Sequence, residues 1–117
     1  MRMWMVDPKV LCQKHLCGEH VELHMFVGTL RKKISVAGYI KNNLLQPRYI
    51  FQRHEELATE MVRREMNHKS EMRETDPDIF HLPIEFQYWE INKDSAMNDL
   101  LSRCPECRKR LGELRNE

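Results

Sequence analysis

Residues 14–30 read KHLCGEHVELHMFVGTL, and this stretch decides the fold. Apolar side chains recur in and around it at three- and four-residue spacings, which place them on one face of an α-helix. This apolar stripe consists of Cys12, Leu16, Leu23, Val27, Leu30 and Ile34. Asp7-Pro8 is a good helix start, because Asp can cap free backbone N–H groups and Pro fits the first turn. We therefore predict a core helix from about residue 8 to residue 33.

Two further helices are expected, separated by segments without a helical period. Residues 36–46 are typical of a connection with one short turn. The second helix, from about residue 48 to residue 66, should bury Ile50, His54, Leu57, Ala58, Met61 and Val62. Residues 67–92 favour an irregular segment that is packed across the helices by Phe80, Phe86, Tyr88 and Trp89.

The third helix should begin at the caps Asp94-Ser95 and end or kink at Cys104-Pro105. Its expected apolar residues are Met97, Leu100 and Leu101, with Leu111 and Leu114 in a last turn. The expected fold class is all-α, a compact bundle of three main helices with a long irregular aromatic segment before the last helix. A chain of 117 residues suits a single domain over residues 1–117.

Composition bounds the possible partners. The chain is 41% hydrophobic and 32% charged, with a formal net charge of only +1, which suits a soluble globular protein. Any surface for nucleic acid must therefore come from local clusters of Lys and Arg. No apolar run approaches the roughly 18 residues that span a bilayer, and none resembles a signal-peptide core. We expect a cytoplasmic protein with no membrane partner, whose four cysteines are reduced.

A second stripe of the first helix carries polar groups. His15, Gly18, Glu19, Glu22 and Phe26 are separated by three, four or seven residues, so they share one side. A glycine inside a helix costs about 1 kcal/mol relative to alanine, which hints at a close approach by another backbone or a ligand. An ordinary solvated face with a tolerated glycine is the alternative.

The N-terminus adds a candidate nucleophile. Arg2 is too large for efficient removal of Met1 by methionine aminopeptidases, so Met1 should keep a free α-amino group. Free α-amines are partly neutral near pH 8, and a neutral amine can form an imine with a sugar aldehyde.

Residues 14–23, followed by Phe26-Val27-Gly28 and Arg31-Lys32, resemble the first helix of the phage-type pyrimidine-dimer DNA glycosylases. The resemblance implies a compact three-helix bundle with the N-terminal segment threaded between the helices. It also implies that the Met1 amine attacks the damaged nucleotide, that Glu22 is the catalytic carboxylate and that His15 lies beside them.

The implied function is a DNA repair glycosylase with AP-lyase activity. By resemblance, the amine displaces the damaged base and forms an imine, whose β-elimination nicks the strand. The implied partner is double-stranded DNA with a damaged or abasic nucleotide, bound by a monomer at the nucleoid of a bacterial or phage-infected cell. The family carries arginines at the positions of Val21 and Met25, so the lesion preference is left open.

Other cations must then supply the phosphate contacts. Arg2 is expected there by resemblance, and clustering of positive charge suggests the rest. The candidates are Arg2, Arg31, Lys32, Lys33, Arg103, Arg108, Lys109 and Arg110. A solvated charged surface is the alternative.

Cys104-Pro105-Glu106-Cys107 is half of a zinc-binding motif, and a tetrahedral site needs two more ligands. Candidates on the first helix are Cys12, Cys17, His20 and His24. Such a zinc would be structural, because the imine chemistry requires no cofactor. The alternative is that these cysteines are small packing residues.

Two other function classes stay open. The chain could be a non-catalytic DNA- or protein-binding module on the same scaffold, which would explain the missing arginines. It could also be a related enzyme that acts on another modified or abasic nucleotide.

Overall fold

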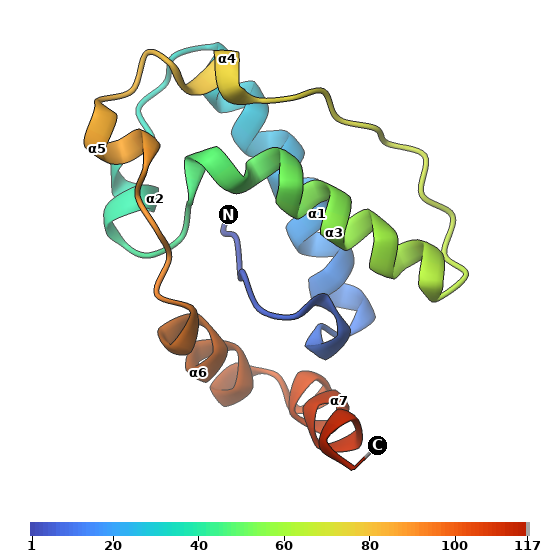
Figure 1. The fold of residues 1–117 in the computed structure, drawn as a ribbon. Coiled ribbons are helices and arrows are strands. Elements are labelled where there is room, and N and C mark those ends of the chain that lie inside the picture. The colour runs from blue at the N-terminus through green and yellow to red at the C-terminus, as the bar shows by residue number, and fades with distance from the viewer. Residues whose placement is uncertain (117) are drawn as a thin grey trace.

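The computed structural model describes residues 1–116, whose regular structure consists of helices without a strand. Two long helices, α1 (Gln13–Arg31) and α3 (Ile50–Arg63), cross at the centre of the molecule (Figure 1). The other elements are the 3-10 helices η1 (Pro8–Val10) and η2 (Pro47–Tyr49), and the α-helices α2 (Ala37–Lys41), α4 (Asp76–Ile79), α5 (Ile84–Gln87), α6 (Lys93–Arg103) and α7 (Pro105–Arg115). The all-α class is confirmed, and α7 is a helix of its own rather than a last turn.

The start of α1 differs from the prediction. Asp7 does accept a hydrogen bond from the Lys9 N–H, but it caps only the short η1. The backbone then becomes extended at Leu11 and Cys12, with ψ angles of 129° and 165°, and α1 begins at Gln13. One cause is a tertiary contact, because the Arg64 guanidinium donates hydrogen bonds to the carbonyl oxygens of Pro8 and Leu11.

Most of the predicted core positions are buried, with informative exceptions. Leu16, Leu23, Val27 and Leu30 of α1 are fully or almost fully buried, as are Ile50, His54, Leu57 and Met61 of α3. Ile34 is exposed because α1 has already ended, and Val62 lies on the solvent side of α3. Phe26, which was expected on the polar stripe, is instead completely buried. The charged side chain of Arg53 is also almost completely buried.

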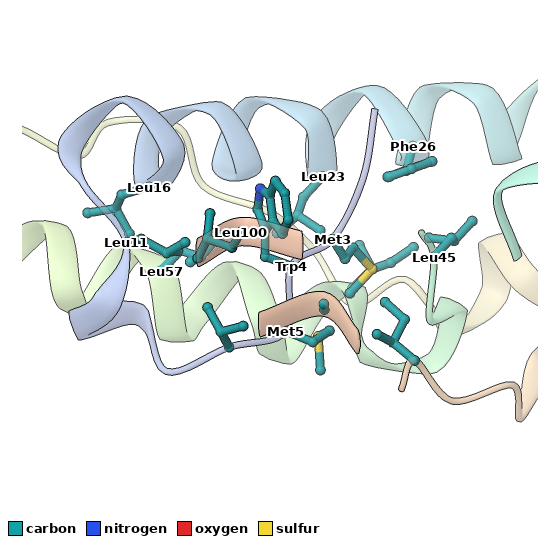
Figure 2. Packing of buried hydrophobic residues seen from close by; sticks show 14 of the residues in the cluster. Met3, Trp4, Met5, Leu11, Leu16, Leu23, Phe26, Leu45, Leu57 and Leu100 are labelled. Atoms are coloured by element: carbon teal, nitrogen blue, oxygen red, sulfur yellow. The ribbon is translucent and has the colours of Figure 1, made fainter. Parts of the chain in front are cut away.

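The N-terminal segment runs through the middle of the helices, as the resemblance implied. Met3, Trp4, Met5 and Val6 are buried. Figure 2 shows the first three among Leu16 and Leu23 of α1, Leu57 of α3 and Leu100 of α6. The Met3 N–H donates to the Leu44 carbonyl at 2.7 Å. Removing one such large apolar side chain from water contributes about 1.5–3 kcal/mol, so this segment is part of the core.

The last third of the chain is only partly as expected. Residues 64–92 are mostly irregular, and Phe86 and Trp89 pack against the core, but Phe80 and Tyr88 are exposed. Helix α6 is capped by Asn92, which accepts from the Ser95 N–H, rather than by Asp94 or Ser95. Cys104 ends α6 and caps α7. Over residues 1–116, no helix combines the length and apolarity that a membrane crossing requires.

Candidate active site

An open cleft of about 1170 Å³ lies between the N-terminal segment, α1, the loop at residues 42–44 and α6. Met1 and Arg2 line it from the N-terminus, Gly18 and Glu22 from α1, and Arg103 from α6. These five residues were all candidates from the sequence, and the fold brings them to one place. Pockets that hold drug-sized ligands measure about 300–1,000 Å³. The cleft is therefore large enough for a nucleotide.

Glu22 is joined to the first peptide unit of the chain. The Arg2 backbone N–H donates to Glu22 Oε2 at 2.9 Å, and both residues are half-buried. This hydrogen bond fixes the Met1 end of the chain beside the Glu22 carboxylate, at the wall of the cleft. Met1 and the Glu22 carboxylate therefore line the same wall of the cleft, and both residues are half-buried.

Arg2 is held by α6. Its guanidinium donates to Asp99 Oδ2 at 2.7 Å and stacks on the Trp4 ring at 3.7 Å from the centroid. Arg103 Nε binds the other Asp99 oxygen at 3.0 Å, so Asp99 bridges two cations. Burial lowers the pKa of Arg2, against the raising effect of Asp99, but the side chain stays a cation. The Arg2 Nε is buried and has no hydrogen-bond partner among residues 1–116.

Glu19 lies on the same stripe as Glu22 but has another task. Its carboxylate accepts from Arg53 Nε at 2.6 Å and from Arg53 NH2 at 3.0 Å, and both side chains are almost fully buried. Arg53 also donates to the Val6 carbonyl at 2.7 Å. The pair thus ties α1 and α3 to the N-terminal segment, whereas among residues 1–116 the Glu22 carboxylate binds only the Arg2 backbone N–H.

His15 stands between the cleft and a cluster of cysteines. Its ring lines the cleft and meets Trp4 edge-on, with centroids 5.6 Å apart. Its Nδ1 lies 3.2 Å from Cys12 Sγ and 3.7 Å from Cys107 Sγ. Burial and the nearby Lys14 lower the pKa of His15, so the imidazole is neutral at pH 7.

The cysteine cluster consists of Cys12, His15, Cys104 and Cys107, and it could hold a metal ion. The sulfurs of Cys12 and Cys104 are 3.8 Å apart. Backbone N–H groups support the sulfurs, since Cys12 N donates to Cys107 Sγ at 3.2 Å and Cys107 N to Cys104 Sγ at 3.4 Å. Of the ligands predicted from sequence, the cluster contains Cys12, Cys104 and Cys107, whereas Cys17, His20 and His24 are outside it and His15 takes the fourth place.

The cations predicted for DNA binding lie in several places. Only Arg2 and Arg103 line the cleft. Arg31, Lys32 and Lys33 are exposed at the far end of α1, where Arg31 binds Asp78 at 3.1 Å. Arg108 and Lys109 are exposed on α7, with Arg108 bound to the Leu101 carbonyl, and Arg110 on the same helix donates to the Lys9 carbonyl.

Sequence reasoning missed several residues of the cleft. Lys14 lies one turn before Gly18, so the helical period could have identified it. Trp4, Asn42, Asn43 and Asp99 also line the cleft, but no local pattern relates them to α1, because they reach it only through the fold.

Comparisons with known proteins support one family. The sequence model of the pyrimidine dimer DNA glycosylases matches residues 1–74, which include the N-terminal segment, α1 and α3. Neither the curated proteins nor the solved structures gave a significant match. The matched region is more than half of the chain and contains Met1, Arg2, His15 and Glu22 of the cleft, and the chain therefore belongs to the pyrimidine dimer DNA glycosylase family.

Proposed function

We propose that this protein is a DNA repair glycosylase with an associated AP-lyase activity, acting on pyrimidine dimers or related damaged or abasic sites. The observation that carries the proposal is the hydrogen bond from the Arg2 N–H to Glu22, which sets the Met1 end beside a carboxylate in an open cleft. Family membership supplies the DNA substrate.

In this mechanism the Met1 amine is the nucleophile. Its lone pair bonds to sugar C1′ while the C1′–N bond to the base breaks, and the base leaves with that electron pair and takes up a proton. The attached nitrogen loses a proton, and its lone pair then forms a C1′=N bond while the C1′–O4′ bond breaks and O4′ takes up a proton, so the sugar ring opens to a protonated imine. This imine loses a proton from C2′, and the electrons expel the 3′ phosphate, which cuts the strand. Glu22 stabilises the cationic sugar and moves these protons, as carboxylates do in other glycosyl transfers.

The reacting nucleotide must leave the base stack to reach the cleft. Arg2, Lys14 and Arg103 are the cations of the cleft that are placed to bind its phosphates, with His15 at the side of the reacting sugar. By resemblance, arginines are expected at the positions of Val21 and Met25. Both side chains are exposed on α1 but apolar, so they contribute no positive charge. We therefore expect only a moderate affinity for duplex DNA. We expect the protein to bind it as a monomer.

Borohydride trapping tests the proposal. We expect the full chain to form a reduced covalent adduct with DNA that contains an abasic site, and mass spectrometry to place the adduct on the Met1 nitrogen. One glycine added before Met1 moves the amine and should abolish trapping. Glu22→Gln should slow base release and nicking by at least 100-fold while DNA binding persists.

An adduct on an internal lysine, or an extended chain that nicks as well as the parent, would refute the assignment of Met1. Binding without any turnover in the parent would favour a non-catalytic DNA-binding module.

We also propose that Cys12, His15, Cys104 and Cys107 bind a structural zinc ion. Zinc bonded tetrahedrally to two thiolates at about 2.3 Å holds the sulfurs about 3.8 Å apart, and the Cys12 and Cys104 sulfurs have that separation. The ion would fasten α7 to the start of α1. The ion would also hold His15, which lines the cleft, in a fixed position. Removing the metal with a chelator should lower the melting temperature while nicking by the folded protein persists.

A further inference from the structure

Three histidines from three parts of the chain converge on the side of α1 away from the cysteine cluster. His20 lies on α1, His54 on α3, and His68 in the irregular segment after α3. His20 Nε2 is 3.0 Å from His54 Nε2 and 2.9 Å from His68 Nε2, and all three nitrogens lie within 4.8 Å of one another. His20 and His54 are buried and His68 is half-buried.

Neutral imidazoles cannot satisfy these contacts among themselves. A ring nitrogen carries either one hydrogen or one in-plane lone pair, so His20 Nε2 can complete only one of its two contacts. One of the two close nitrogen–nitrogen contacts is therefore left without a hydrogen bond when the rings are neutral.

The surroundings of His54 sharpen the conflict. Its Nδ1 lies 3.0 Å from Glu55 Oε1, and its Nε2 lies 2.9 Å from the Ser70 carbonyl oxygen. Both partners are acceptors, so either neutral tautomer leaves one ring nitrogen facing an oxygen without a hydrogen between them. A cation bonded to Nε2 removes the conflict, with Nδ1–H donating to Glu55, which is the arrangement common among metal-bound histidines.

His24 adds a fourth imidazole beside the three. Its ring centroid is 5.1 Å from that of His20 and 5.0 Å from that of His54. The Ser70 carbonyl that lies 2.9 Å from His54 Nε2 also interacts with the His24 ring. His24 thus adds a fourth ring to the surroundings of the three without being one of the converging nitrogens.

We propose that His20, His54 and His68 bind one divalent transition-metal ion of the zinc type, with water or the Ser70 carbonyl in the remaining position. Nitrogens bonded tetrahedrally at about 2.0–2.1 Å stand about 3.3–3.4 Å apart, so the ion needs the nitrogens of the His20–His54 and His20–His68 pairs to separate by only a few tenths of an ångström. This site is independent of the cysteine cluster, because five residues separate His15 from His20, which turns their side chains about 140° apart around α1.

The ion gives the segment after α3 an anchor. Residues 66–75 have no regular structure, and only Thr75 among them is fully buried. His68 contacts His20 of α1 and His54 of α3, and the Ser70 carbonyl of the same segment also contacts His54. Metal binding therefore fastens the segment across α1 and α3, and the site does not depend on the proposed glycosylase activity.

Cobalt substitution of the full chain tests the proposal. We expect two equivalents of Co²⁺ per chain, one with the near-ultraviolet thiolate charge-transfer band of a cysteine site and one with visible bands alone. His68→Asn should lose one equivalent and keep the thiolate band, whereas Cys107→Ser should lose that band and keep the other equivalent. The control is His81→Ala, since His81 is exposed and outside both clusters, and it should bind two equivalents.

A second measurement covers the case in which a variant folds poorly. Adding zinc to the metal-free parent should slow amide hydrogen exchange at residues 66–75 by at least tenfold. His68→Asn binding as much cobalt as the parent would overturn the proposal. Complete loss of bound metal in Cys107→Ser would also overturn it.

Discussion

Gly18 faces the cleft, and no other part of the described chain approaches it. A Cβ added there would meet no atom within 4 Å, so the close approach by another backbone that the sequence suggested is absent from residues 1–116. The glycine lowers helix stability without a packing reason. Its position at the cleft between His15 and Glu22 leaves the substrate as the remaining reason.

Gly18→Ala should therefore separate stability from activity. We expect the free energy of unfolding to rise by up to about 1 kcal/mol, because alanine favours the helix, while the added methyl group weakens binding of abasic DNA several-fold. Gly28→Ala is the matched control, since Gly28 also lies in α1 with open space at its Cβ but does not line the cleft. Urea unfolding and DNA titration measure the two effects. If Gly18→Ala binds DNA as Gly28→Ala does, the glycine has no part in recognition.

At this scale the helical period of α1 predicted which residues share a side, but not their partners. It placed Glu19 and Glu22 on one stripe, and both line the cleft. It could not tell them apart, because the partner of Glu19 is Arg53, which is 34 positions away. For His15 a local signal existed, since Cys12 and His15 have the spacing of two metal ligands on one helical turn, whereas nothing local linked them to Cys104.

The elements are held together by buried ion pairs as well as by apolar contacts. Arg53 joins α1, α3 and the N-terminal segment through Glu19 and the Val6 carbonyl. Sequence predicted an apolar face for α3, and a buried arginine within that face has no signature in hydrophobic periodicity. The helix starts were likewise missed by up to five residues, because tertiary contacts such as that of Arg64 decide where the backbone becomes helical.

Arg53→Met should destabilise the protein by about 3–5 kcal/mol, because it leaves the Glu19 carboxylate buried without its partner. Adding Glu19→Gln should recover part of that loss, since no uncompensated charge then remains. Arg31→Ala is the control, because the Arg31 side chain is 54% exposed and a surface ion pair contributes about 0–1 kcal/mol. Denaturant unfolding of the parent and the three variants measures these differences. Equal losses for Arg53→Met and Arg31→Ala would contradict a buried pair.

The end of α3 predicts a dependence of stability on acid. Hydrogen bonds from Arg63 lower the pKa of Glu60 to about 2, with Arg64 acting in the same direction against burial. The Glu60 carboxyl is only 4% exposed. Since its pKa is lower in the folded than in the unfolded chain, its contribution is complete above about pH 4.5 and is lost as the pH falls toward 2. We expect about 2 kcal/mol, which allows for the exposure of Arg63.

Comparison with Glu60→Gln isolates this contribution. The two proteins should differ in free energy of unfolding at pH 6 and converge between pH 4.5 and pH 2. Titrating groups elsewhere affect both proteins alike, so only the difference counts. A difference that stays constant down to pH 2 would show that Glu60 does not ionise in the way its ion pairs require.

For the whole molecule, the near-zero net charge makes the arrangement of the cations decisive. The predicted cations are spread over the cleft, the far end of α1 and α7, so they do not form one surface. Composition predicted that any binding surface must be local, but the threading of the N-terminus between α1 and α6, which creates the cleft, follows from the whole fold. It brings residues 97 positions apart, Arg2 and Asp99, into contact.

Binding of duplex DNA should accordingly be moderate and strongly dependent on salt. Each phosphate contact by a cation contributes about 0.9 to the slope of log affinity against log salt concentration. Arg103 lines the cleft with its side chain 65% exposed, so Arg103→Ala should weaken binding to damaged and undamaged duplexes alike and lower the slope by about 1. Arg115→Ala is the control, because Arg115 is exposed at the end of α7 and outside the cleft. Titrations at several salt concentrations give both slopes. An unchanged slope for Arg103→Ala would mean that the DNA backbone does not cross the α6 side of the cleft, and an affinity that ignores salt would exclude phosphate contacts as the source of binding.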